Sequence, residues 1–71
     1  MSDSTLARIC EAHGITIEDL RGPSHAAVYV QARRCAAREL RARKLSLPSI
    51  GRLLHRHHTT ILNLLAPKGA A

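Results

Sequence analysis

The segment of residues 46–65, SLPSIGRLLHRHHTTILNLL, constrains the fold more than any other part of the chain. Ser46 is a favoured N-cap, and Pro48 suits the first turn of a helix, where its missing N–H costs no hydrogen bond. Apolar residues then recur at helical spacing: Leu47, Ile50, Leu53 and Leu54. The pattern predicts a short helix that ends at a corner formed by residues 55–57.

A second short helix is predicted to begin near His58 and to end by Pro67, because proline cannot continue a helix. Its inward residues are predicted to be Ile61, Leu64 and Leu65. Gly51 lies inside the first helix, where glycine costs about 1 kcal/mol relative to alanine. We expect a helix that crosses close to Gly51 to be the packing reason for this glycine.

The other side of the second helix carries polar residues that a hydrophobic core would not need. Arg56, Thr59, Thr60 and Asn63 are spaced so that they share one face of a helix. Arginine, asparagine and threonine bond to phosphate oxygens and to the edges of bases. Two short helices with such a face predict a helix-turn-helix, whose second helix lies in the major groove of DNA.

The string SLPSIGRLLHRHHTTIL resembles the C-terminal DNA-binding domain of the bacterial replication initiator DnaA. That family has approximately S-L-x-x-I-G, an aromatic or apolar residue, and then G-R-D-H-T-T-V-L. The residues that match are Ser46, Leu47, Ile50, Gly51, Arg56, His58, Thr59, Thr60 and Leu62. Upstream, ITIEDL and QARRCAAREL resemble the second and third helices of the family, so the resemblance covers about residues 5–66.

The resemblance implies roles for individual residues. It places Arg56, His58, Thr59 and Thr60 in the major groove or on its flanking phosphates, and Pro48 on a base or a sugar edge. It makes Arg38 a basic residue of the long helix that approaches the duplex. Asn63 stands where the family often has histidine, so its contact with bases is inferred from helical geometry alone.

Three departures from the family pattern suggest that the target sequence, the specificity or both differ from those of the initiator. His57 replaces the acid before H-T-T, which removes an acceptor for a base amino group and changes helix capping. Residues 21–29 lack the basic loop that inserts arginine into the minor groove, since only Arg21 and His25 remain near it. Such a lost contact costs about 1–3 kcal/mol of affinity. The segment of residues 41–45 is longer than in the family.

The composition fits a small basic domain. Residues 23–71 carry nine Lys and Arg against Glu39 alone, and this asymmetry favours binding to a polyanion. With Tyr29 as the only aromatic residue, the core must consist of Leu, Ile, Val and Ala.

We expect one domain over residues 1–71 with a frayed tail at residues 68–71. No segment could span a membrane and MSDSTLARI lacks a signal-peptide pattern, so we expect a cytoplasmic, nucleoid-associated protein.

The first half of the chain contains further helix signals. Ser2, Asp3 or Ser4 can cap a first helix that Gly14 ends, and Thr16 with Asp19 predicts a capped short helix. Ser24 is predicted to cap a long helix over about residues 25–43. Its predicted inward residues are Val28, Ala32, Cys35 or Ala36, and Leu40. The whole is an all-α fold, a compact bundle of four to five helices that contains the helix-turn-helix.

Arg34, Arg38 and Arg41 recur on another face of the long helix, with Lys44 one turn further. Such a face is often only solvated, but it lacks acidic partners one turn away and leads into the helix-turn-helix, so we expect phosphate contacts. The complete set of predicted DNA-binding residues is Arg34, Arg38, Arg41, Pro48, Arg52, Arg56, His57, His58, Thr59, Thr60 and Asn63.

The cysteines and histidines have simpler interpretations. Cys10 and Cys35 lack metal-ligand spacing and are expected to be two buried thiols on apolar helix faces. Residues 55–58 include three histidines without a nearby carboxylate or cysteine, so we predict no metal site and no cofactor. His58 either contacts DNA, as the resemblance implies, or caps its helix; His55 and His57 would favour phosphates once protonated.

The chain contains no G-x-x-x-x-G-K-[ST] motif and no catalytic constellation, so neither ATP-driven strand opening nor an enzyme with a small-molecule substrate is expected. Two hypotheses remain. The first is a regulator of transcription or replication that binds double-stranded DNA, as a homodimer or with a larger regulatory protein, because one monomer covers few base pairs. The alternative is a small adaptor that modulates such a complex with weak or no specific DNA binding, although Val30 and Leu62 are the only exposed apolar residues expected.

Overall fold

The computed structural model describes residues 2–66 and contains five helices in that range. They are α1 (Ser2–His13), α2 (Ile17–Arg21), α3 (Ala27–Ala42), α4 (Leu47–Leu54) and α5 (His58–Leu65). The described residues form no strand, which confirms the predicted all-α bundle. The tail predicted at residues 68–71 lies outside the described part. No helix in the described part is long and apolar enough to cross a membrane.

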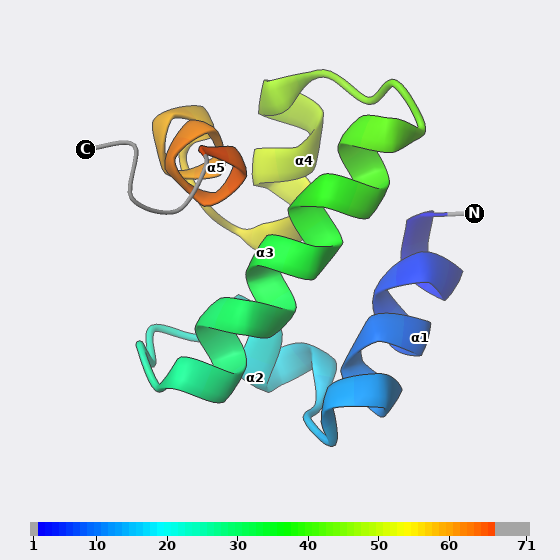
Figure 1. The fold of residues 1–71 in the computed structure, drawn as a ribbon, viewed down its shortest axis with the longest axis vertical. Coiled ribbons are helices and arrows are strands. Elements are labelled where there is room, and N and C mark those ends of the chain that lie inside the picture. The colour runs from blue at the N-terminus through cyan, green and yellow to red at the C-terminus, as the bar shows by residue number, and fades with distance from the viewer. Residues whose placement is uncertain (1, 67–71) are drawn as a thin grey trace.

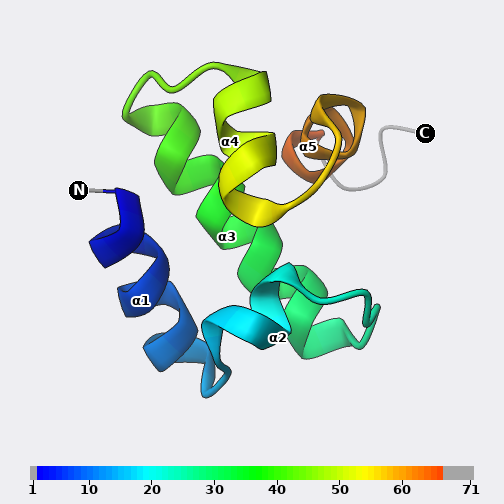
Figure 2. The same cartoon turned by 180° about the vertical axis from the view of Figure 1, so that it is seen from behind.

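The long helix α3 is the centre of the fold. Figures 1 and 2 show α1 and α5 on opposite sides of α3, while α2 lies beside its N-terminal half. Every helix contributes to one core of buried residues: Leu6, Cys10, Leu20, Ala32, Ala36, Ala37, Leu40, Ile50, Leu54, Ile61 and Leu64. The three buried alanines of α3 have short side chains, so the neighbouring helices can approach its backbone closely.

The buried face of α3 differs from the predicted one. Ala32, Ala36 and Leu40 are buried as expected, but Val28 is 41% exposed and Cys35 is exposed. Arg33 and Ala37 are buried in addition. The helix is therefore rotated slightly from the predicted orientation, and the prediction that both cysteines are buried is wrong for Cys35.

Both ends of α3 also differ from the prediction. The helix begins at Ala27, and its N-cap Ala26 makes no side-chain cap. The Ser24 hydroxyl instead accepts from the Ala26 N–H at 3.3 Å and stabilises a local turn. At the other end α3 stops at Ala42, and Lys44 has a left-handed backbone with φ 68°, so it does not extend the arginine face of the helix.

The shorter elements follow their local signals, with one exception. Thr16 and Asp19 form the predicted capping box at α2, and Gly14 ends α1 with φ 69°. The exception is the start of α1, which already includes Ser2. Asp3 and Ser4 therefore lie inside the helix, and the predicted caps are wrong.

The helix-turn-helix has the predicted boundaries. Ser46 caps α4 by accepting from the Ser49 N–H at 3.3 Å, and Pro48 lies in the first turn. The chain then turns at His55, whose φ of 53° is left-handed, before α5 begins at His58. The packing reason for Gly51 is the corner itself and no crossing helix, because a Cβ at Gly51 would lie 2.5 Å from the carbonyl oxygen of Arg56.

Candidate nucleic-acid interface

The N-terminal half of α5 presents a polar surface beside a buried one. His58, Thr59 and Asn63 are exposed, and Thr60 is half-buried. Ile61 and Leu64 point into the core from the opposite face. Because these anchors fix the rotation of α5, its hydroxyl, imidazole and amide groups are held on the outside of the domain. This surface contains four of the predicted DNA-binding residues, whose contacts with DNA stay predictions.

His57 is the N-cap of α5, a role that the sequence did not assign to it. Its Nδ1 accepts from the Thr59 N–H at 3.3 Å and also contacts the Thr59 hydroxyl. The imidazole rings of His57 and His58 lie side by side, with 4.2 Å between their centroids. His57 is exposed, so the ring that caps the helix also forms part of its outer surface.

Arg56 has a different environment from the other predicted DNA-binding residues. Its guanidinium is half-buried and donates to three backbone carbonyls, those of Arg21 at 3.2 Å, His55 at 3.2 Å and Gly22. It therefore attaches the corner between α4 and α5 to the end of α2. A contact between Arg56 and DNA stays a prediction. It would have to be made by the N–H groups of Arg56 that do not bond to these carbonyls.

Arg33 is a structural residue that the sequence prediction missed. Its side chain is almost fully buried, and it donates to four carbonyls within residues 19–24: Leu20 at 2.7 Å, Ser24 at 2.6 Å, Gly22 at 2.8 Å and Asp19 at 3.1 Å. Burial, with a smaller effect of Arg56, lowers the pKa of Arg33. The helical spacing of Arg33, Ala37 and Leu40 could have indicated that Arg33 faces inward.

A third arginine completes the attachment of α2. The Arg21 Nε–H donates to the carbonyl oxygen of Leu53, near the end of α4, at 2.8 Å. Arg21 thus bonds to α4 through its side chain, while its own carbonyl accepts from Arg56. Guanidinium groups are well placed here, because the carbonyl end of a helix is partly negative. The helix-turn-helix is therefore fixed to α2 by bonds in both directions.

The predicted arginine face of α3 divides into two parts. Arg34 and Arg38 line a groove of about 580 Å³ with His25, Ala27, Val30 and Gln31. The Nε of Arg34 is buried without a hydrogen-bond partner. Arg41 is exposed and donates to the carbonyl of Leu45 at 2.9 Å, in the turn that follows α3. Arg34 and Arg38 therefore share one potential anion site that does not include Arg41.

Pro48 and Arg52 are exposed on α4, as a contact with DNA would require. Glu39 lies 3.5 Å from both Arg8 and Arg43. Its carboxylate is therefore directed to those two cations and does not form an ion pair with the predicted phosphate-contacting arginines. Among residues 2–66, no group of three His, Cys, Asp or Glu is arranged to hold a metal ion.

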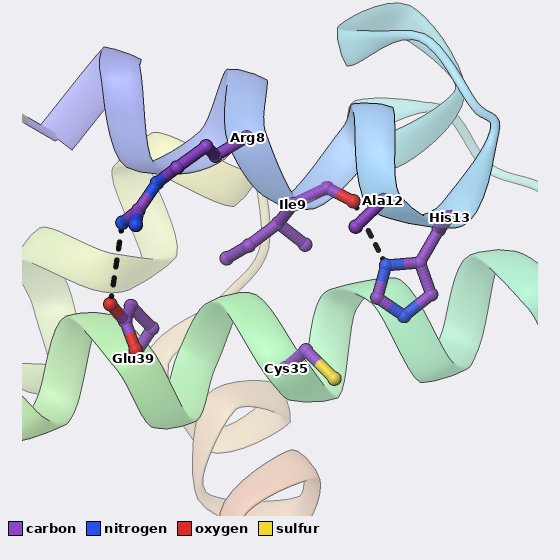
Figure 3. Close-up of a pocket in the computed structure, with 6 residues that line it drawn as sticks. All are labelled: Arg8, Ile9, Ala12, His13, Cys35 and Glu39. Carbon is purple, nitrogen blue, oxygen red and sulfur yellow. Dashed lines mark hydrogen bonds and ion pairs between the residues drawn. The ribbon is translucent and has the colours of Figure 1, made fainter.

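A second groove of about 400 Å³ lies between α1 and α3 (Figure 3). It is lined by Arg8, Ile9, Ala12, His13, Cys35 and Glu39. Within it, the Arg8 guanidinium faces the Glu39 carboxylate, and His13 Nδ1 lies 2.9 Å from the carbonyl of Ile9. Since α1 and α5 lie on opposite sides of α3, this groove is separate from the polar surface of α5.

Exposed apolar side chains are few in the described part of the chain. Val28 and Leu62 are the large apolar residues that are exposed, at 41% and 49%. Val30, which the sequence predicted to be exposed, is half-buried beside the groove of Arg34. The surface of residues 2–66 therefore provides little exposed apolar area for a protein partner.

Comparison with known proteins agrees with the resemblance. The family model described as bacterial dnaA protein helix-turn-helix matches residues 3–66, which is most of the 71-residue chain. No curated protein matches the chain. The matched range includes all five helices except the first residue of α1.

Proposed function

Because this chain belongs to the bacterial DnaA helix-turn-helix family, whose members bind double-stranded DNA, we propose that it regulates transcription or replication by occupying duplex sites with α5 in the major groove. Occupation of a site would block, compete with or recruit other proteins there. The main support is the exposed polar edge formed by His58, Thr59 and Asn63 on a helix whose other side is anchored in the core.

Basic residues on α3 and α4, the two helices that pack against α5, support the same proposal. Arg34 and Arg38 share a groove on α3, and Arg52 is exposed on α4. The chain has a net charge of +6, which attracts a polyanion before any specific contact forms. In this proposal these arginines bind phosphates and set the register of α5, while Thr59, Thr60 and Asn63 contact base edges. Arg41, Pro48, Arg56, His57 and His58 complete the proposed surface.

Titration of the labelled domain with a duplex oligonucleotide, followed by NMR, tests the location of the interface. We expect the largest shift changes at the amides of residues 57–63 and at the side chains of Arg34, Arg38 and Arg52. Changes confined to α1 and α2 would exclude this orientation. Addition of the same oligonucleotide as a single strand is the control for attraction by charge alone.

The salt dependence of binding distinguishes the regulator from the adaptor. Each phosphate that the domain neutralises steepens the slope of log K against log salt by about 0.9, so several contacts give a strong dependence. Weak binding with a flat slope would favour a small adaptor. Preference for one duplex among sequences of equal length would favour the regulator.

A further inference from the structure

The cap of α5 determines which nitrogen of His57 carries the proton. A backbone N–H is always a donor, so the contact of 3.3 Å from the Thr59 N–H requires a lone pair on Nδ1. The Thr59 hydroxyl also contacts Nδ1 and can donate to it. In the neutral ring, a lone pair on Nδ1 places the proton on Nε2. The fold therefore selects one tautomer of His57.

The Nε2–H of this tautomer is a donor on the outer surface of the domain. Nε2 lies across the ring from Nδ1, and His57 is exposed. Within residues 2–66, no group accepts a hydrogen bond from Nε2. The neighbouring His58 ring packs beside His57, with its centroid 4.2 Å away, and limits the directions in which the imidazole can turn. His57 thus presents one oriented N–H beside the exposed start of α5.

A single oriented donor distinguishes between bases in the major groove. Guanine presents two adjacent acceptors there, N7 and O6, whereas cytosine presents the N4 amino group, which is a donor. An N–H that faces guanine gains a hydrogen bond, and one that faces cytosine meets another donor. Adenine and thymine are intermediate, since each has one acceptor beside an amino or a methyl group.

We propose that His57 is a specificity-determining residue that donates its Nε2–H to guanine at one base pair of the target. This inference rests on the proposed function and adds a base preference to it. A phosphate oxygen would also accept from Nε2, but a phosphate contact carries no sequence preference. A preference for one base at one position would therefore show that Nε2 contacts a base and not a phosphate.

Asparagine and aspartate form a matched pair of substitutions for the test. Both are strong N-caps through a side-chain oxygen, so both preserve the start of α5. Their side chains have the same length, but the second group of asparagine is an N–H donor and that of aspartate is an acceptor. The two variants therefore differ in whether residue 57 offers a hydrogen-bond donor or an acceptor to the base.

Selection from randomised duplexes, with the unchanged chain, His57→Asn and His57→Asp, measures the effect. We expect one position at which the unchanged chain and His57→Asn favour guanine and His57→Asp favours cytosine or adenine. At that position the ratio of affinities for guanine and cytosine duplexes should differ by about tenfold between the variants. If both variants keep the preferences of the unchanged chain, or if the aspartate weakens all duplexes equally, His57 does not contact a base.

The tautomer can be measured without DNA. Long-range ¹⁵N–¹H correlation spectra of the imidazole, recorded above the pH range in which histidine gains a proton, should show Nε2 protonated and Nδ1 unprotonated. Protonation of Nδ1 would overturn the proposal, whatever the DNA result. If the unchanged chain shows no salt-dependent binding to duplexes, the proposed function is wrong, and this inference is wrong with it.

Discussion

Arg33 and Arg56 both donate to the carbonyl oxygen of Gly22, although one belongs to α3 and the other to the corner of the helix-turn-helix. Gly22 directly follows α2, so this single oxygen joins three parts of the fold. Burial lowers the pKa of Arg33, and repulsion between the two guanidinium groups lowers it further. The carbonyls that accept from the two groups offset part of this repulsion.

Replacement of Arg33 by leucine should destabilise the domain strongly. The change leaves the carbonyls of Leu20 and Ser24 without the donor that Arg33 supplies, and unsatisfied groups of this kind cost about 1–3 kcal/mol each when buried. We expect the free energy of unfolding, measured by urea denaturation, to fall by at least about 2 kcal/mol. The matched control is Arg38→Leu on the exposed face of α3, which should change it by at most about 0.5 kcal/mol. Equal effects would show that the carbonyl contacts of Arg33 are not stabilising.

Replacement of Arg56 by alanine should change the free domain as well as its binding. Loss of the bonds to Arg21 and Gly22 should lower the free energy of unfolding by about 1–2 kcal/mol and shift the amide signals of residues 21–24. Arg56→Lys should restore part of the stability, because one ammonium can still donate to these carbonyls. If Arg56→Ala weakens DNA binding while stability and amide signals stay unchanged, Arg56 acts only through DNA.

Thr59→Ala and Arg38→Ala should affect DNA binding in different ways. The threonine variant should weaken preferred duplexes by about 1–3 kcal/mol with little effect on random sequences. The arginine variant should weaken binding to all duplexes similarly. It should also reduce the slope of log K against log salt by about 0.9, which corresponds to one phosphate contact. Anisotropy titrations with a selected and a scrambled duplex measure both effects. If the two variants lose affinity equally on every sequence, α5 does not recognise bases.

Gly51→Ala should destabilise the corner although alanine is the better helix former. The new Cβ would lie 2.5 Å from the carbonyl oxygen of Arg56, which is backbone and cannot move freely. We expect a loss of about 1–3 kcal/mol, more than the gain in helix propensity of about 1 kcal/mol. Thermal unfolding measures the loss, with Asn63→Ala on the exposed face of α5 as the control. A stabilised Gly51→Ala variant would show that the corner can relax.

The two cysteines should react with alkylating reagents at very different rates. Cys35 is exposed in the groove between α1 and α3, whereas Cys10 is 3% exposed. Burial raises the pKa of the Cys10 thiol, against the smaller opposing effect of Arg21. Mass spectrometry should therefore find the first label on Cys35, with Cys10 labelled only after unfolding. Simultaneous labelling in the native state would contradict the burial of Cys10.

The raised pKa of Cys10 also gives the sign of a pH effect. The folded state holds the thiol proton more tightly than the unfolded state, so the contribution to stability is complete below the ordinary thiol pKa of 9.0. It is lost as the pH rises through the higher folded value. At alkaline pH, the free energy of unfolding should therefore fall less in Cys10→Ala than in Cys35→Ala.

Much of the fold and the outline of the candidate site could be predicted from the sequence. The capping box of Thr16, the early Pro48 and the corner at His55 are signals between close neighbours in the chain, and each gave the correct element. The exposure of Thr59 and Asn63 followed from the apolar residues that share their helix. The contacts of these residues with DNA stay predictions.

The sequence by itself determined the boundaries of α2, α4 and α5, because their caps, turns and helical periodicity depend on residues only a few positions apart. Only the tertiary structure decided the rotation of α3, which buries Arg33 and exposes Cys35, and the partners of Arg56. Arg56 bonds to carbonyls 34 and 35 residues earlier in the chain. Such contacts depend on how whole helices pack, and a backbone carbonyl is present at every residue, so no local pattern identifies the one that an arginine reaches.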